Sequence, residues 1–159
     1  MTRFSFLAAV AVTSAMSFSA LAATATGTAN ATVLTPITIA AGTALNFGTL
    51  AGNASGGTVV VTAAGARSTT GSVVVTSGSF AAGTFTVAGT GSSTFAVTYP
   101  GSFNVVSGAN TMAVLVNGAA TGTLSGGTVS LPVGGTLTVG ANQAAGSYTG
   151  TYTMTVEYN

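Results

Sequence analysis

The last fourteen residues of the chain alternate between two kinds of side chain. One parity is apolar, aromatic or glycine and holds Gly146, Tyr148, Gly150, Tyr152, Met154, Val156 and Tyr158. The other parity carries hydroxyl groups from Ser147 to Thr155, followed by Glu157. A period of two is that of a β-strand with two different faces. The pattern therefore predicts a strand over residues 148–158 that packs its apolar face on a core and can offer its backbone to another chain.

The composition indicates a folded β protein. Only 2% of the 159 residues are charged, against about 25% in an ordinary soluble domain. Hydrophobic residues still make up 47%, and Val and Thr are abundant among all residues. Disordered chains are poor in such residues, because they cannot bury enough apolar surface to offset the entropy of ordering. We therefore predict one domain of the all-β class.

Residues 1–22 have the organisation of a cleaved signal peptide. Arg3 gives a cationic start, and residues 4–21 are largely apolar and small. Ala20 and Ala22 occupy the small-residue positions of a cleavage site, so cleavage is expected after Ala22, with Ala23 as a near alternative. A membrane anchor is the alternative, but Thr and Ser interrupt the run and no second apolar stretch follows it. We expect an exported protein without a membrane span.

The inventory of chemical groups argues against catalysis. The chain has no His and no Cys, and a single acidic residue, Glu157. General acid–base catalysis, a catalytic triad and the usual metal sites all need groups that are missing here. After cleavage only Arg67 remains as a cation, so no basic patch exists for nucleic acid. We predict no enzyme, no cofactor, no metal, no disulfide and no nucleic-acid partner.

Short alternations recur between glycine-rich breaks along the rest of the chain. They predict nine strands over residues 31–40, 58–63, 72–76, 84–88, 94–99, 111–116, 128–133, 135–139 and 148–158. This pattern is typical of a single immunoglobulin-like antiparallel β-sandwich of about eight or nine strands, here placed over residues 34–159. Pro36 cannot donate to a strand ladder, so the first strand is expected at a sheet edge or at a bulge.

Residues 23–33 form a distinct N-terminal extension. Its alternation is regular, but its apolar parity is small and holds Ala25, Gly27, Ala29, Ala31 and Val33. Such a strand buries little apolar surface. Because burial stabilises by about 25 cal/mol per Å², the strand would be held only weakly. Two interpretations stay open. The segment is either a donor strand that pairs with a groove in the next subunit, or a loose tail of the kind common at termini.

Two motifs carry a resemblance to a known family. They are Leu45-Asn46-Phe47-Gly48 and the ending Gly146-Ser147-Tyr148-Thr149-Gly150-Thr151-Tyr152. With the leading signal segment and the Val/Thr strands, they resemble a family of secreted bacterial domains without an assigned function. That family is similar to spore-coat-U-like and other chaperone–usher fimbrial subunits.

The resemblance implies an incomplete sandwich and a specific use for the C-terminal strand. In such pilins a periplasmic chaperone pairs with this strand, which has a Gly fourteenth from the end and a penultimate Tyr. Gly146 and Tyr158 occupy these positions, and Asn159 carries the terminal carboxylate that the chaperone grips. Later the N-terminal extension of the next subunit fills the groove.

The function expected from the resemblance is structural. It is a non-catalytic subunit of a cell-surface fibre that serves adhesion or biofilm cohesion, exported through the periplasm of a Gram-negative bacterium. Its partners would be copies of itself or related subunits, a periplasmic chaperone and an outer-membrane usher. The alternative is a self-complete surface or matrix domain that binds a ligand such as carbohydrate through rows of Tyr or Thr.

Overall fold

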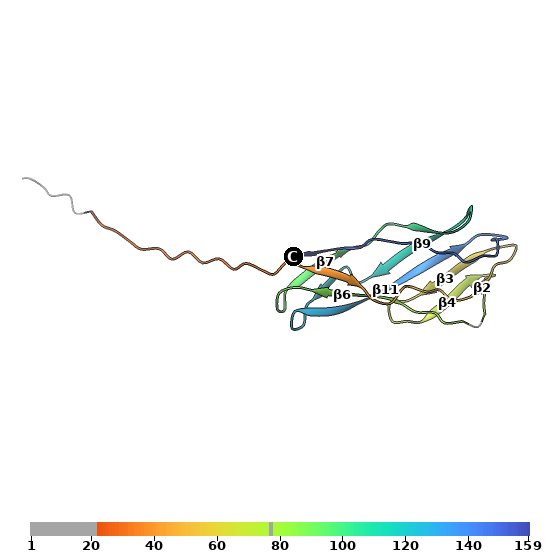
Figure 1. Cartoon of the computed structure of the whole chain (residues 1–159), viewed down its shortest axis with the longest axis horizontal. Coiled ribbons are helices and arrows are strands. Elements are labelled where there is room, and N and C mark those ends of the chain that lie inside the picture. Colours follow the sequence, from red (N-terminus) through yellow and green to blue (C-terminus); the bar gives the residue numbers. More distant parts are fainter. Residues whose placement is uncertain (1–21, 77) are drawn as a thin grey trace, which may run out of the picture. The chain divides into compact units, whose positions relative to one another are not determined.

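A computed structural model describes residues 22–76 and 78–159, and every regular element in them is a β-strand (Figure 1). The all-β prediction is confirmed. Residues 1–21 of the predicted signal peptide lie outside the described residues. The strands are β1 (Thr38–Ala41), β2 (Leu50–Ala51), β3 (Gly57–Val61), β4 (Arg67–Gly71), β5 (Val74–Val75), β6 (Gly83–Ala88), β7 (Thr94–Thr98), β8 (Phe103–Ser107), β9 (Asn110–Gly118), β10 (Thr121–Thr123), β11 (Thr128–Val139) and β12 (Thr155–Tyr158).

The largest sheet has seven antiparallel strands built around β11. Its order is β1-β6-β11-β3-β4, and β9 also pairs with β11 and carries β8. Val133 pairs with both Gly83 of β6 and Gly118 of β9. Because a residue has one partner at each strand edge, β6 and β9 lie on opposite edges of β11. Gly135 likewise pairs with both Val61 of β3 and Val116 of β9, so β3 lies on the same edge of β11 as β6, further along the strand.

The prediction of separate strands over 128–133 and 135–139 is wrong, because β11 is continuous. The two predicted strands are separated only by Gly134. Instead, Gly134 pairs with Asn117 and Gly135 pairs with Val116, so the ladder with β9 runs through both glycines. A Cβ on Gly134 would collide with the backbone of Val61, so a glycine is needed where β3 passes close to β11.

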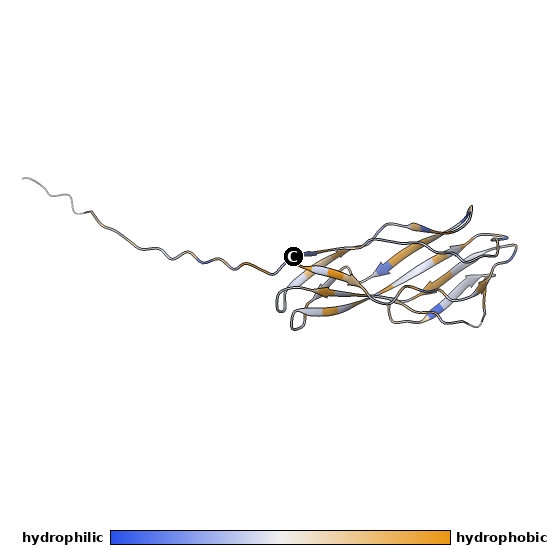
Figure 2. Ribbon diagram, in the orientation of Figure 1, coloured by the Kyte–Doolittle hydropathy of each residue, from blue (hydrophilic) through white to orange (hydrophobic). Residues whose placement is uncertain are grey.

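A second sheet contains three strands in the order β10-β7-β12, and β2 pairs with β5. Apolar residues fall mainly on the strands (Figure 2). Alternate residues of β9, namely Met112, Val114 and Val116, are buried, as a period of two requires. The main core cluster also contains Val59, Val73, Val87, Phe95, Val97, Leu124, Leu131, Val133, Leu137, Val139, Met154 and Val156.

The C-terminal alternation is reproduced in burial, but the strand is shorter than predicted. Tyr148, Tyr152 and Tyr158 are partly buried and Met154 and Val156 are buried, whereas the hydroxylated parity is exposed. Regular pairing is confined to β12. The reason is a change of neighbour: Thr149 bridges to Val106 of β8 in the large sheet, and β12 then pairs with β7 in the small sheet.

The first strand also differs from the prediction over 31–40, because β1 begins only at Thr38. Pro36 removes a backbone donor and holds the residue before it in an extended conformation. The expected edge position is confirmed, since β1 ends the strand order and pairs only with β6. Residues 22–32 belong to a separate unit, carry no regular secondary structure and are exposed throughout.

Four strands, β2, β4, β8 and β10, lie outside the predicted ranges. Strand β4 reads RSTTG and has no apolar alternation, so its sequence gives little strand signal. It forms as the second arm of a hairpin with β3, in which Thr58 and Thr70 are partners. In the described part of the chain there is no helix long and apolar enough to cross a membrane.

Candidate functional site

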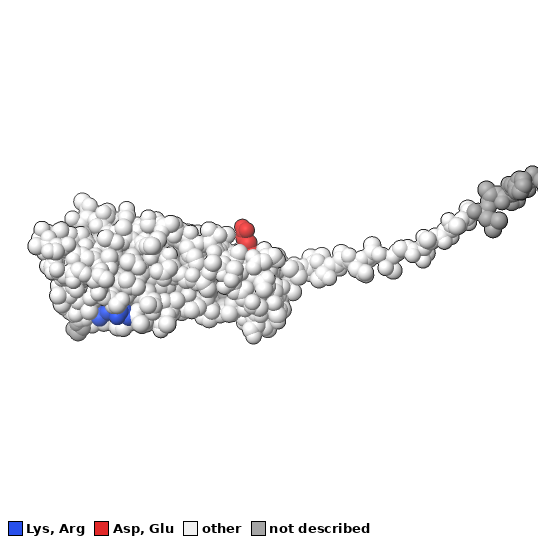
Figure 3. Space-filling view, turned by 180° about the vertical axis from the view of Figure 1, so that it is seen from behind, with Lys and Arg blue, Asp and Glu red and all other residues white. Residues whose placement is uncertain are grey.

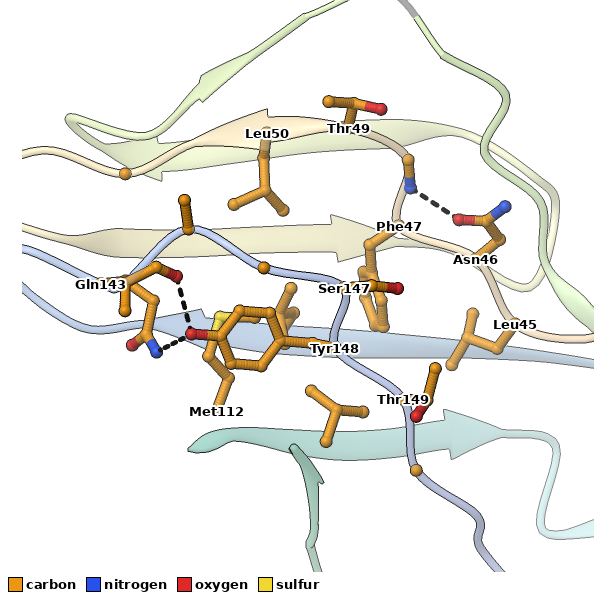
Figure 4. Close-up of a pocket in the computed structure, with 18 of the residues that line it drawn as sticks. Leu45, Asn46, Phe47, Thr49, Leu50, Met112, Gln143, Ser147, Tyr148 and Thr149 are labelled. Carbon is orange, nitrogen blue, oxygen red and sulfur yellow. Dashed lines mark hydrogen bonds between the residues drawn. The ribbon is translucent and has the colours of Figure 1, made fainter. Parts of the chain in front are cut away.

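A groove runs between two chain segments that are far apart in the sequence. A cavity of about 870 Å³ lies between residues 44–52 and residues 143–152 (Figure 4). A smaller cavity of about 290 Å³ shares Ala44, Leu45, Gly150 and Tyr152 with it. This smaller cavity continues to Ala41 and Phe85. We call the two together the seam groove, residues 44–52 its first wall and residues 143–152 its second wall.

The floor of the seam groove is part of the apolar core. Phe103, Val105, Met112 and Leu137 line it from three strands of the large sheet. All the lining residues belong to the described part of the chain, and none carries a formal charge. Only 2% of the residues are charged, and the face in Figure 3 shows two isolated charged spots. The groove thus favours an uncharged, partly apolar occupant.

The first wall is shaped by the Leu45–Gly48 motif. The side chain of Asn46 accepts a hydrogen bond from Gly48 N at 2.9 Å, and its backbone exchanges two bonds with Ala81. Gly48 has a φ of 81°, a conformation that favours glycine. Leu45 and Phe47 both lie against Gly135 of β11, where a Cβ would meet them. The motif therefore folds a tight turn that presents two apolar side chains to the groove.

Arg67 holds this wall from outside the groove. Its Nη1 donates to the carbonyl oxygen of Phe47 at 3.1 Å, and its guanidinium carbon lies 4.4 Å from the ring centre of Phe80. A cation over an aromatic face is stabilised by the ring quadrupole. No role for Arg67 could be predicted from the sequence, because both contacts join it to segments more than ten residues away.

The second wall is anchored through Tyr148. Its hydroxyl donates to Ala144 O at 2.7 Å and accepts from Nε2 of Gln143 at 2.8 Å. Gln143 also donates to Thr111 O at 3.3 Å, which ties the wall to β9. Figure 4 shows the Tyr148 ring in the cavity opposite Leu50 and Phe47. The hydrogen bonds fix the ring as part of the groove lining.

Tyr152 continues the second wall toward the smaller cavity. Its ring centre lies 5.2 Å from that of Phe103 and 5.9 Å from that of Phe85, the latter edge-to-face. Burial raises the pKa of the Tyr152 hydroxyl above its ordinary value, so the side chain stays neutral at physiological pH. The aromatic cluster keeps this part of the groove apolar.

The two walls are not paired with each other. Among the described residues, no backbone hydrogen bond joins 44–52 to 143–152. A backbone hydrogen bond joins the residues just beyond the two walls, where Asn142 N donates to Asn53 O at 2.8 Å. The first wall pairs instead with Ala81 and β5, and the second wall pairs at Thr149 with β8. Each wall therefore has its strand partner elsewhere, and neither wall serves as the strand partner of the other across the groove.

The structure brings the two sequence motifs together but not all the predicted site residues. Leu45, Asn46, Phe47 and Gly48 line one wall of the groove, and Gly146, Tyr148, Gly150 and Tyr152 line the other. Met154 and Val156 are buried in the core, and Tyr158 and Asn159 lie outside the groove. The donor candidates Ala25, Gly27, Ala29 and Ala31 are exposed, and Val33 is 92% exposed.

Fold and site together define a class: an antiparallel all-β domain with an uncharged groove between its N-terminal and C-terminal segments. The chain belongs to the family described as a domain of unknown function (DUF4402), which matches residues 37–158. That match covers both walls of the groove and leaves the N-terminal extension outside. No curated protein and no solved structure shows a significant match.

Proposed function

We propose that the protein is a non-catalytic structural subunit of a cell-surface fibre, built by β-strand addition and serving adhesion or biofilm cohesion. In this proposal the domain is an immunoglobulin-like sandwich that lacks one strand at the seam groove. The observation that carries it is the pair of walls that stand over an apolar floor without being hydrogen-bonded to each other. An added strand would gain main-chain hydrogen bonds from the walls and bury alternate side chains on the floor.

The proposed occupant is the N-terminal extension, residues 23–33, of a second copy. At about 3.3 Å per residue, the eleven residues of the extension span about 36 Å when extended. The extension is uncharged, like the groove lining. Its small alternate residues suit a groove that already holds the Tyr148 ring.

The position of the extension favours open-ended assembly. Thr38 pairs with Ala88, which pairs with Thr128, so the start of β1 lies at the beginning of β11. The floor residue Leu137 lies nine residues further along β11, about 30 Å away. Extension and groove are different surfaces, so their contact is heterologous. Contacts of this kind form fibres when the rotation does not close a ring.

Export and assembly partners follow from the same proposal. A groove with an apolar floor between two walls that are not hydrogen-bonded to each other is prone to unwanted pairing before assembly. We propose that a periplasmic chaperone covers it after export, and that an outer-membrane usher directs its exchange for the extension.

Deleting residues 23–33 is expected to leave a folded protein that cannot elongate. Full-length mature protein should form thin regular filaments by electron microscopy, and the deletion variant should stay monomeric by size-exclusion chromatography with light scattering. Circular dichroism of both proteins checks the fold. Filaments from the truncated chain, or a full-length chain that stays monomeric at high concentration, would contradict the proposal. Binding of a neutral oligosaccharide at Tyr148 by such a monomer would support the carbohydrate alternative.

A further inference from the structure

The penultimate residue, Tyr158, ties the C-terminal strand to the point where the N-terminal extension begins. Its hydroxyl donates to Thr35 O at 2.8 Å and accepts from Thr90 N at 2.8 Å. Thr35 N in turn donates to Oγ1 of Thr90 at 2.7 Å. Both backbone groups of Thr35 are therefore occupied. We call Thr35, Thr90 and Tyr158 the root clamp.

Two further residues fit the root clamp closely. Gly89 lies against the Tyr158 hydroxyl, and a Cβ at this position would collide with it. Pro36 follows Thr35 directly, and the residue before a proline is held in an extended conformation. Just before β1 the chain is thus fixed by the hydrogen bonds of Thr35 and by the extended conformation that Pro36 imposes on that residue.

This arrangement bears on which groove an extension can fill. The near end of the seam groove is lined by Ala41, six residues after Thr35. An extension that filled the groove of its own domain would have to reverse direction before β1. A turn N-terminal to Thr35 would consume part of residues 23–33, so only a reversal at Thr35 leaves the whole extension to lie beside the first wall. A reversal of this kind is a tight turn, and its central residues cannot both be extended. The root clamp holds Thr35 extended.

We infer that the root clamp prevents the extension from folding back into its own groove and so directs it to a second copy. This inference rests on the proposed function, in which the extension is the occupant of the groove. It makes Tyr158 a positioning residue: it contacts neither wall of the groove and acts through the backbone of Thr35.

The test is Tyr158→Phe in the full mature chain, alone and combined with Pro36→Gly. The phenylalanine keeps the ring and removes both hydrogen bonds of the hydroxyl. Tyr99→Phe is the matched control, because that hydroxyl donates to Ala119 O at 2.9 Å and its residue does not line the groove. Hydrogen exchange of the monomeric fraction, read by mass spectrometry, follows the amides of residues 23–34. Filament yield is measured in parallel.

In the wild type and in Tyr99→Phe, monomers should show fast exchange over 23–34. In Tyr158→Phe and the double variant, the loss of two hydrogen bonds should slow this exchange by about tenfold, because the extension occupies its own groove. Filament yield should fall by a similar factor. Monomers of the double variant with an extension that exchanges as fast as in the wild type would overturn the inference.

The outcomes separate the inference from the proposed function. Protected extensions in variant monomers, with no filaments from the wild type, would support the root clamp and contradict the fibre. Normal filaments from the double variant, with unprotected monomers, would support the fibre and contradict the clamp.

Discussion

Replacing Val156 with aspartate is expected to release the C-terminal strand and unfold much of the domain. Val156 is 9% exposed and pairs with Val97 in the small sheet. The described residues of the core contain no buried polar or charged side chain that could compensate the new carboxylate. An uncompensated buried charge costs about 3–5 kcal/mol, a large share of the roughly 5–15 kcal/mol that holds a typical domain together.

The neighbouring residue provides the control. Thr155 is exposed on the opposite face of the same strand, so Thr155→Asp should change the free energy of unfolding by less than about 0.5 kcal/mol. Urea denaturation followed by circular dichroism measures both variants. Equal losses at the two positions would show that the alternation does not define a buried face and an exposed face.

Replacing Phe95 with alanine is expected to lower the free energy of unfolding by about 3–5 kcal/mol. Phe95 is fully buried, and it is the largest of the side chains with almost no exposure. It lies in β7, the central strand of the small sheet, where its ring contacts Gly122 of β10 and its backbone pairs with Tyr158 of β12. The loss of the ring would leave a cavity beneath both flanking strands.

Two variants calibrate this effect. Phe95→Leu keeps most of the apolar volume and should cost clearly less than the alanine, and Thr94→Ala tests an exposed neighbour in the same strand. Thermal and urea unfolding give the three values. A loss below about 1 kcal/mol for Phe95→Ala would mean that the small sheet is held by something other than this ring.

The fold was predictable where the local pattern and the tertiary environment agree. The alternation around Met154 and Val156 indicated the correct buried face, and Pro36 indicated an edge strand. The extent of pairing was not predictable, because it depends on which neighbour is present. Thr149 meets β8 and Thr155 meets β7, and the segment between them crosses from one sheet to the other.

The candidate site was predictable only as separate motifs. Leu45–Gly48 and Gly146–Tyr152 are about a hundred residues apart, and nothing in either motif shows that they line one groove. The contacts of Arg67 with Phe47 and Phe80 likewise depend on long-range geometry. The bond from the Tyr158 hydroxyl to Thr35 O joins the two ends of the domain, and the same hydroxyl accepts from Thr90 N; no periodicity in the chain indicates either bond.

The most direct test of the account is a cross-link between two copies. The chain has no cysteine, so Ala29→Cys in the extension of one protein and Ser147→Cys in the second wall of another are the only thiols in a mixture. Ser68→Cys, on the exposed part of β4, replaces the wall variant as control. We predict a disulfide between the extension and the wall of different copies, identified by mass spectrometry, and none with the control. Equal cross-linking of the two serine variants, or no cross-link to the wall, would contradict the claim that the groove receives the extension of another copy.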